Sequence, residues 1–169
     1  PIVMTSEKEE PGAWGGIHIC GRAHTNAEGG KGSSEIGGAV YGGNDDADNS
    51  GTLQYIRLEY TGFAFDEEHE ANGISFYGVG NGTIVDHCQA YKGSDDGFEF
   101  FGGSVNVSNL VAVSCSDDSF DWTEGWNGKG TNLVAYQEAE STLGFDCDCL
   151  LECDNNGSNN AATPVAHPV

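Results

Sequence analysis

Basic residues are scarce in this chain. Only six of its 169 residues are Lys or Arg, whereas 27 are Asp or Glu, and the formal net charge at pH 7 is -21. Proteins that bind nucleic acid neutralise phosphates with clustered basic side chains. The scarcity therefore excludes an ordinary nucleic-acid reader, and we expect no nucleic-acid partner. A solvated, soluble surface accounts for part of the acidity.

Long apolar runs and helical patterns are also missing. No run approaches the roughly 18 apolar residues that cross a bilayer, so no membrane span is expected. No long window repeats apolar residues at the helical spacing, and the one helix-friendly stretch, residues 137–140, is too short to stand as a helix. These absences predict an all-β chain.

Motifs for nucleophilic catalysis and for zinc are absent. The sequence contains no G-x-S-x-G elbow and no C-x-x-C pair, so it singles out no catalytic residue. The six cysteines are Cys20, Cys88, Cys115, Cys147, Cys149 and Cys153. Outside the cytoplasm they are candidates for disulfides, and the alternative is free thiols buried inside the fold.

A repeated motif is the most informative feature that is present. Residues 94–100 read SDDGFEF, and residues 116–122, 22 positions later, read SDDSFDW. A repeat of this length is typical of a solenoid, because each unit buries its apolar face only against its neighbours. In both segments aromatic residues alternate with acids, which indicates strands with the aromatics inward and the acids outward. We predict a parallel β-helix with coils of about 22–25 residues.

Neighbouring coils can be aligned with these two. Residues 73–76 fit one coil earlier and residues 144–147 one coil later. Ile74, Phe98, Phe120 and Phe145 are then expected to form an internal ladder. The second strand of each coil is predicted in the β-rich runs 53–60, 83–91, 105–113 and 133–136. We expect one β-helix domain over residues 1–169, with an irregular C-terminal segment at 154–169.

The repeated acids predict a cation site. The candidate ligands are Asp95, Asp96, Glu99, Asp117, Asp118 and Asp121. Two carboxylates about 5 Å apart repel by roughly 3 kcal/mol at an effective dielectric near 20. A hard cation that takes six to eight oxygens relieves this repulsion, so Ca²⁺ is the predicted structural cofactor. The alternative is that the acids extend into solvent and cap turn amides.

Weaker ligand candidates lie elsewhere. Asp45, Asp46 and Asp48 form an acidic loop that lacks the bidentate Glu of an EF-hand, and an Asx-rich surface turn is the stronger interpretation. Glu70 precedes a predicted coil strand closely enough to face the acids of the neighbouring coil. Phe101 and Trp126 are the candidate ligand-facing aromatics, because the alternation places Trp122 inside.

Four segments carry a resemblance to known proteins: residues 11–16, 41–51, 94–103 and 154–160. They resemble bacterial secreted or surface-anchored right-handed parallel β-helix proteins, which are mostly uncharacterised and often lipoproteins. The resemblance covers nearly the whole chain. It implies a right-handed β-helix at the cell surface or outside the cell, and it says little about activity.

The acidic turns are also similar to those of calcium-dependent pectate lyases. That resemblance implies that the six carboxylates of the repeated motif bind Ca²⁺ and that a Lys or Arg removes a proton from a uronate. The chain departs from the pattern at the base, because Asp146 stands where a Lys is expected one coil onward. Lys92 and Lys129 are the nearby amines.

The favoured function is a non-enzymatic extracellular scaffold or binding module stabilised by calcium. Its expected partners are further copies of itself, an extracellular matrix or a polysaccharide. Residues 1–6 look like an unpaired solenoid strand, which favours head-to-tail assembly into a filament, and the chain is interpreted as a mature product or a fragment of a longer one. The alternatives are a calcium-dependent polysaccharide lyase and an acidic-glycan-binding domain without catalysis.

Overall fold

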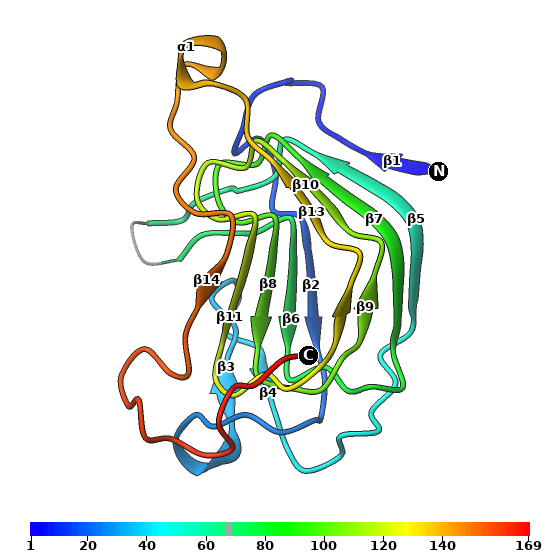
Figure 1. Ribbon diagram of the computed structural model, residues 1–169, viewed down its shortest axis with the longest axis vertical. Coiled ribbons are helices and arrows are strands. Elements are labelled where there is room, and N and C mark those ends of the chain that lie inside the picture. The colour runs from blue at the N-terminus through cyan, green and yellow to red at the C-terminus, as the bar shows by residue number, and fades with distance from the viewer. Residues whose placement is uncertain (67–68) are drawn as a thin grey trace.

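The computed structural model describes residues 1–66 and 69–169, and its two main sheets face each other across an apolar core (Figure 1). Sheet A runs in the order β1 (Ile2–Met4), β5 (Thr52–Glu59), β7 (Ile84–Tyr91), β10 (Val111–Val113) and β13 (Val134–Tyr136). Beside these strands lie β9 (Val107–Ser108) and β12 (Gly130–Thr131). Sheet B runs in the order β14 (Glu152–Cys153), β11 (Phe120–Thr123), β8 (Phe98–Phe101), β6 (Ile74–Tyr77) and β2 (Ile17–Cys20).

The chain alternates between the two sheets, and their strands pair in parallel. This arrangement confirms the predicted all-β parallel helix. A separate antiparallel hairpin joins β3 (Gly32–Ser33) to β4 (Val40–Tyr41). The helical elements are the 3-10 turn η1 (Glu28–Gly30) and α1 (Glu140–Leu143). Within the described residues, no helix combines the length and the apolar character that a membrane span requires.

Inward-facing side chains form ladders along the solenoid. Ile74 pairs with Phe98 and Phe98 with Phe120, as the sequence predicts, and all three are buried. The rings of Phe98 and Phe120 stack with centroids 5.5 Å apart. Phe145 does not continue the ladder, because β14 at 152–153 pairs with Asp121 and Trp122. The prediction that residues 144–147 form this strand is therefore wrong by several residues.

Coil length is regular only in the middle of the molecule. Phe98 pairs with Phe120, 22 residues on, and Ile74 pairs with Phe98, 24 residues on, which agrees with the predicted 22–25. Pairing from β2 to β6 spans 57 residues, from Ile17 to Ile74, and pairing from β11 to β14 spans 31, from Asp121 to Glu152. The longer coils carry insertions next to sheet B.

Left-handed residues mark a corner of the coils within sheet A. Tyr55, His87, Asn109 and Asn132 have φ values of 56°, 51°, 54° and 55°. Non-glycine residues rarely adopt this conformation, although asparagine tolerates it. The Nδ2 of Asn132 donates to Oδ1 of Asn109 over 3.0 Å, which links this corner from one coil to the next. Repetition of one backbone bend at one corner keeps successive coils in register.

All six cysteines lie within the described residues, and all are free thiols. The expectation of disulfides is therefore not supported. Cys88 and Cys115 are fully buried in the core, where they pack as small apolar side chains, the alternative raised by the sequence. Burial raises the pKa of the Cys115 thiol to about 12, so this thiol is inert at neutral pH.

Candidate functional site

The outward face of sheet B carries a row of polar residues. The register aligns one residue from each strand: His18, Ser75, Glu99, Asp121 and Glu152. Three neighbouring members of this row are carboxylates, because the strand alternation that buries Phe98 and Phe120 turns Glu99 and Asp121 to the other side. The row therefore concentrates negative charge over β8, β11 and β14.

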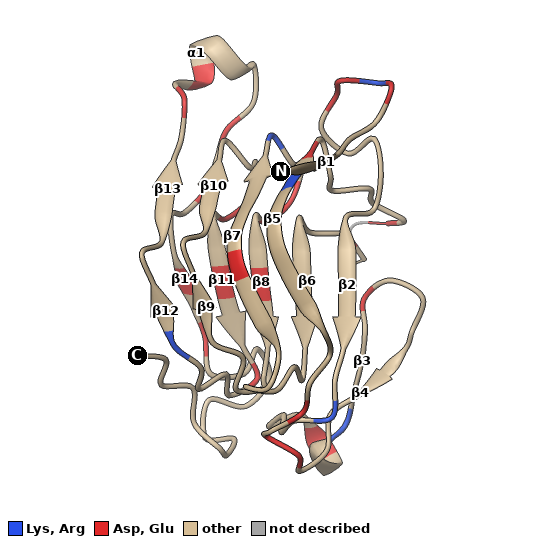
Figure 2. Ribbon diagram, turned by 90° about the vertical axis from the view of Figure 1, so that its right-hand side faces the viewer, with Lys and Arg blue, Asp and Glu red and all other residues tan. Residues whose placement is uncertain are grey.

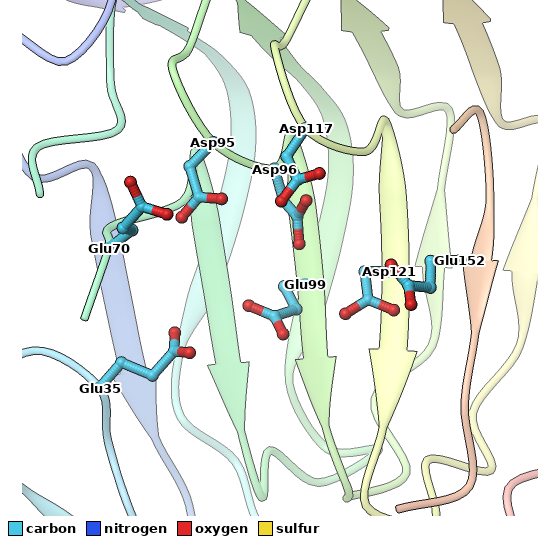
Figure 3. Close-up of a pocket in the computed structure, with 8 residues that line it drawn as sticks. All are labelled: Glu35, Glu70, Asp95, Asp96, Glu99, Asp117, Asp121 and Glu152. Atoms are coloured by element: carbon cyan, nitrogen blue, oxygen red, sulfur yellow. The ribbon is translucent and has the colours of Figure 1, made fainter. Parts of the chain in front are cut away.

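Five further acids join the row to form a cavity of about 230 Å³. Its lining residues are Glu35, Glu70, Asp95, Asp96, Glu99, Asp117, Asp121 and Glu152. Figure 3 shows their carboxylates gathered over the strands of sheet B, with Glu35 and Glu70 approaching from the side. Every described lining residue is an acid. We name this set of eight residues the acidic pocket.

Two kinds of backbone deliver these acids. Asp95, Asp96 and Asp117 lie in the turns just before β8 and β11, at the repeated Asp-Asp pairs of the sequence. Glu35 lies at the tip of the β3–β4 hairpin, and Glu70 lies between β5 and β6. The solenoid repeat thus supplies the centre of the pocket, and the insertions supply its rim.

Carboxylate oxygens lie close together in groups of three residues, within the pocket and at its edge. Three triads have ligand atoms that all lie within 4.8 Å of one another: Asp95, Asp96 and Asp117; Asp96, Glu99 and Asp121; Asp118, Asp121 and Glu152. The triads share Asp96 and Asp121, so they form one continuous chain of carboxylates. All six ligand candidates from the repeated motif are members.

Asp96 and Asp118 also have a structural role. Oδ1 of Asp96 accepts a hydrogen bond from the backbone N–H of Asp118 over 2.9 Å, and Oδ1 of Asp118 accepts one from Cys149 over 2.7 Å. Each carboxylate therefore ties its own coil to the next. One oxygen each of Asp96 and Asp118 therefore caps a backbone amide, which was the alternative to a cation site in the sequence analysis.

Burial and mutual repulsion disfavour ionisation of the pocket. Burial, followed by repulsion from Glu70 and Asp117, raises the pKa of Asp95 to about 7. Burial also raises the pKa of Asp121 to about 6 and holds the pKa values of Asp96 and Glu99 well above their usual range. A nearby cation would reverse this, because it favours the charged form of each carboxylate.

The donor set suits a hard cation. All the ligand atoms of the pocket are carboxylate oxygens, the ligands that Ca²⁺ and Mg²⁺ take, and one buried oxygen, Oδ1 of Asp121, has no hydrogen-bond partner. Asn72, which is fully buried, donates from Nδ2 to Oε2 of Glu99 over 2.5 Å and so orients that carboxylate. Buried polar atoms normally have a partner, so this unpartnered oxygen of a residue that belongs to two triads is available to a cation.

A basic catalytic group is not among the described residues that line the pocket. Lys92 instead pairs with Glu138, with Nζ 3.2 Å from Oε2. The sequence alignment placed Asp146 opposite the lyase base, but the register puts Glu152 in that row. The position is acidic in either alignment, so proton abstraction by a Lys or Arg has no support at this point of the pocket.

The weaker candidate loop is engaged in other contacts. Arg22 lies 3.1 Å from Oδ1 of Asp48 and 3.5 Å from Oδ2 of Asp45, and Nδ1 of His24 lies 2.7 Å from Oδ1 of Asp46. These cationic and imidazole partners occupy oxygens that a metal would need. The interpretation as a surface turn therefore describes this loop better than a cation site.

The two aromatic residues expected to face a ligand are both buried. Trp126 is 1% exposed and stacks on Phe100 with centroids 4.2 Å apart, while its Nε1 donates to the carbonyl of Val105. Phe101 points outward but is 8% exposed, because Tyr77 stacks on it and Tyr41 packs against Tyr77. The expectation that they face a ligand is wrong, because an insertion covers Phe101 and the chain turns Trp126 into the core.

Sequence reasoning missed Glu35 and Glu152. Glu35 lies in a Gly- and Ser-rich hairpin far from the repeat, and no sequence signal connects it to the pocket. Glu152 would have been found by aligning Leu151-Glu152-Cys153 with Phe120-Asp121-Trp122, which preserves the apolar and acidic alternation. Glu70, a weaker candidate, does line the pocket.

Comparison with known proteins agrees with this architecture. A family model described as a pectate-lyase-like beta helix domain matches residues 1–169. No curated protein and no solved structure matches the chain. The match spans every coil of the solenoid, and the chain therefore belongs to the family of pectate-lyase-like beta-helix domains.

Proposed function

We propose that this chain is a calcium-stabilised extracellular or cell-surface module that acts by scaffolding or binding. The observation that carries the proposal is the acidic pocket, with three linked triads of oxygens within 4.8 Å. Seven acids supply the ligands: Asp95, Asp96, Glu99, Asp117, Asp118, Asp121 and Glu152. Calcium sites in extracellular modules have Kd values of about 10⁻⁴–10⁻³ M, and the ligand charge and rigidity of a site set its affinity.

Chelation tests this proposal directly. At pH 7.5 and with calcium at about 100 times its Kd, binding should stabilise the fold by about 2.7 kcal/mol. We therefore expect EDTA to lower the melting temperature by about 5–10 °C, measured by circular dichroism. Magnesium serves as the matched control, because it demands a smaller octahedral site and should stabilise less. An unchanged melt together with no calcium in the purified protein contradicts the proposal.

A polysaccharide lyase is the second candidate, favoured by the family match. It requires a base within reach of a cation-bound uronate, and the described lining of the pocket consists of acids. Incubation with polygalacturonate and calcium should therefore produce no new ultraviolet absorbance from unsaturated uronides. Retention on that polymer without turnover would identify an acidic-glycan-binding domain.

Head-to-tail assembly is a further part of the proposal. We propose a right-handed winding of the coils, because crossovers between parallel strands of one sheet are almost always right-handed. Ile2, in an inward-facing row of β1, is 62% exposed, and Leu151, before β14, is 52% exposed, so apolar side chains are exposed at the outermost strands of both sheets. Such edges can stack on further copies. Light scattering at high protein concentration with calcium should detect filaments, and monomers alone would contradict assembly.

A further inference from the structure

The β3–β4 hairpin lies against sheet B and is anchored at its base. Tyr41, in β4, is 3% exposed, and its ring centroid lies 5.1 Å from that of Tyr77 in β6. Its hydroxyl donates to Oε2 of Glu124 over 2.8 Å. Buried aromatic packing and a charge-assisted hydrogen bond therefore fix the base of the hairpin on the solenoid.

The tip of the hairpin is held differently. Residues 34–39 are closed mainly by their own contacts: the Ser34 hydroxyl donates to the Ile36 carbonyl and accepts from the Ala39 N–H, both over 2.9 Å. The Tyr77 hydroxyl joins the tip to sheet B by donating to Oε2 of Glu35 over 3.3 Å, which is long for such a bond. Polar contacts thus hold the tip, since Ser34 also hydrogen-bonds Cys20 of β2, whereas aromatic packing anchors the base.

Glu35 brings a further negative charge to the rim of the pocket. It lines the cavity, and Figure 3 shows its carboxylate directed toward Glu99 and Glu70. It is not a member of the triads that the described residues form within 4.8 Å, so its oxygens lie outside them. With the pocket free of cations, neighbouring carboxylates repel Glu35. With a cation in the pocket, the same residue is attracted.

We propose that Glu35 is a cation ligand supplied from outside the solenoid, and that cation binding draws the tip of the β3–β4 hairpin onto sheet B. This inference rests on the proposed calcium site and adds a residue and a coupled motion to it. A ligand that binds one arrangement of the hairpin more tightly must shift the hairpin toward that arrangement. The hairpin then acts as a clamp that closes only over a loaded pocket.

Two measurements on the full chain, with CaCl₂ as the probe, test the clamp. Hydrogen exchange follows protection of the hairpin tip, and calorimetry measures the affinity for calcium. Calcium should slow amide exchange in residues 33–39 and in the turns at 95–97 and 117–119. Glu35→Gln keeps an acceptor for the Tyr77 hydroxyl but removes the charge, so it should weaken calcium binding about tenfold. In this variant calcium should still protect the two turns but no longer the hairpin tip. Glu28→Gln, on the exposed turn η1 of the same insertion, is the matched control and should behave as the wild type.

The outcomes separate the clamp from the site beneath it. Wild-type calcium binding with unchanged exchange at 33–39, or a Glu35→Gln affinity equal to that of Glu28→Gln, overturns the clamp and leaves the proposed calcium site standing. Absence of calcium binding by the wild type overturns both. Melting of each variant in EDTA checks that the substitutions leave the fold intact.

Discussion

Sheets A and B are built from the same coils, yet their outward faces differ in charge. One outward row of sheet A contains Val3, Arg57, Gln89, Val111 and Val134, whereas the matching kind of row in sheet B contains His18, Ser75, Glu99, Asp121 and Glu152. Figure 2 shows acids on the neighbouring strands β8, β11 and β14 of sheet B, whereas the acids of sheet A include Asp86 on β7 and Glu59 at the end of β5. The inward ladders hold the fold, and this leaves the outward rows free to differ.

Two aspartates show how far the faces differ. Asp86 in β7 accepts hydrogen bonds from Asn109 and Ser108, each over 2.8 Å, and these donors hold the pKa of its carboxyl well below the usual range. In β11, Asp121 has a buried oxygen without a partner, and burial raises its pKa to about 6. Both residues face outward from a parallel strand. Hydrogen-bond donors favour the ionised form of Asp86, whereas burial disfavours the ionised form of Asp121, so surroundings rather than place in a coil set the pKa of each carboxyl.

The largest loss of stability is expected from a substitution in the apolar core between sheets A and B. Phe98→Ala removes a fully buried ring that stacks on Phe120 between the sheets. It should lower the free energy of unfolding by roughly 3–5 kcal/mol, measured by urea denaturation, and weaken calcium binding as well. If calcium affinity stayed normal while stability fell, the pocket would be independent of the inward ladder.

The pH dependence should differ in sign from that of an ordinary acidic protein. Carboxyls with raised pKa values, near 7 for Asp95 and Glu35, bind protons more tightly folded than unfolded. Their stabilising contribution is complete below the unfolded pKa near 4 and is lost as the pH rises through about 7. Burial lowers the pKa of His18, and this destabilises the fold below about pH 6.5. His18 is a single group, whereas several carboxyls contribute in the opposite direction.

In EDTA the melting temperature should therefore be at least about 5 °C higher at pH 5 than at pH 7.5. Excess calcium should reduce or reverse this difference, because the cation favours the ionised carboxylates. Melting scans across this range provide the measurement. A metal-free protein that becomes steadily more stable toward pH 7.5 would contradict the burial of repelling acids.

Paired substitutions sharpen the comparison of the faces. Asp121→Asn removes a repelling charge, so it should raise the melting temperature in EDTA while weakening calcium binding. Asp86→Asn weakens the acceptor of three donors, including His87, and should lower the melting temperature without affecting calcium binding. Both variants change the net charge equally, and calorimetry with thermal melts distinguishes them. Effects of the same sign in EDTA would remove the distinction between the faces.

The smallest effect is expected at the outer surface of sheet A. Tyr136 in β13 is 58% exposed, so Tyr136→Ser should change the free energy of unfolding by no more than about 0.5 kcal/mol. Calcium affinity should not change. A larger loss, or reduced self-association in light scattering, would mean that β13 is covered by another copy in solution.

Much of the fold follows from the sequence. The alternation of Phe98 and Phe100 with Glu99 predicts a strand and its buried face, and the recurrence at Phe120 predicts parallel stacking. These are local patterns repeated at a fixed spacing. The last coil was misplaced because Gly144-Phe145 resembles Gly97-Phe98, whereas the insertion before β14 shifts the true strand to 152–153. A repeat predicts register only while coil length stays constant.

The centre of the site was also predictable, and its rim was not. The repeated motif predicted six of the seven residues that form the linked triads, all except Glu152. Glu35 reaches the pocket through a contact between a hairpin and sheet B that no periodicity encodes. Phe101 and Trp126 were misjudged for a related reason, since the insertion carrying Tyr41 covers one and the core encloses the other. Long-range packing of inserted segments decides these positions.

Unequal loop lengths also order the steps by which the chain can fold. Strands β8 and β11 join residues 22 apart, whereas β2 and β6 join residues 57 apart. Closing the longer loop costs about 0.8 kcal/mol more in chain entropy, and solenoids can nucleate at any coil. The middle coils are thus expected to form first and the first coil, with its hairpin, to dock last. Because Glu35 belongs to that late segment, a fully enclosed cation would report that folding has reached completion.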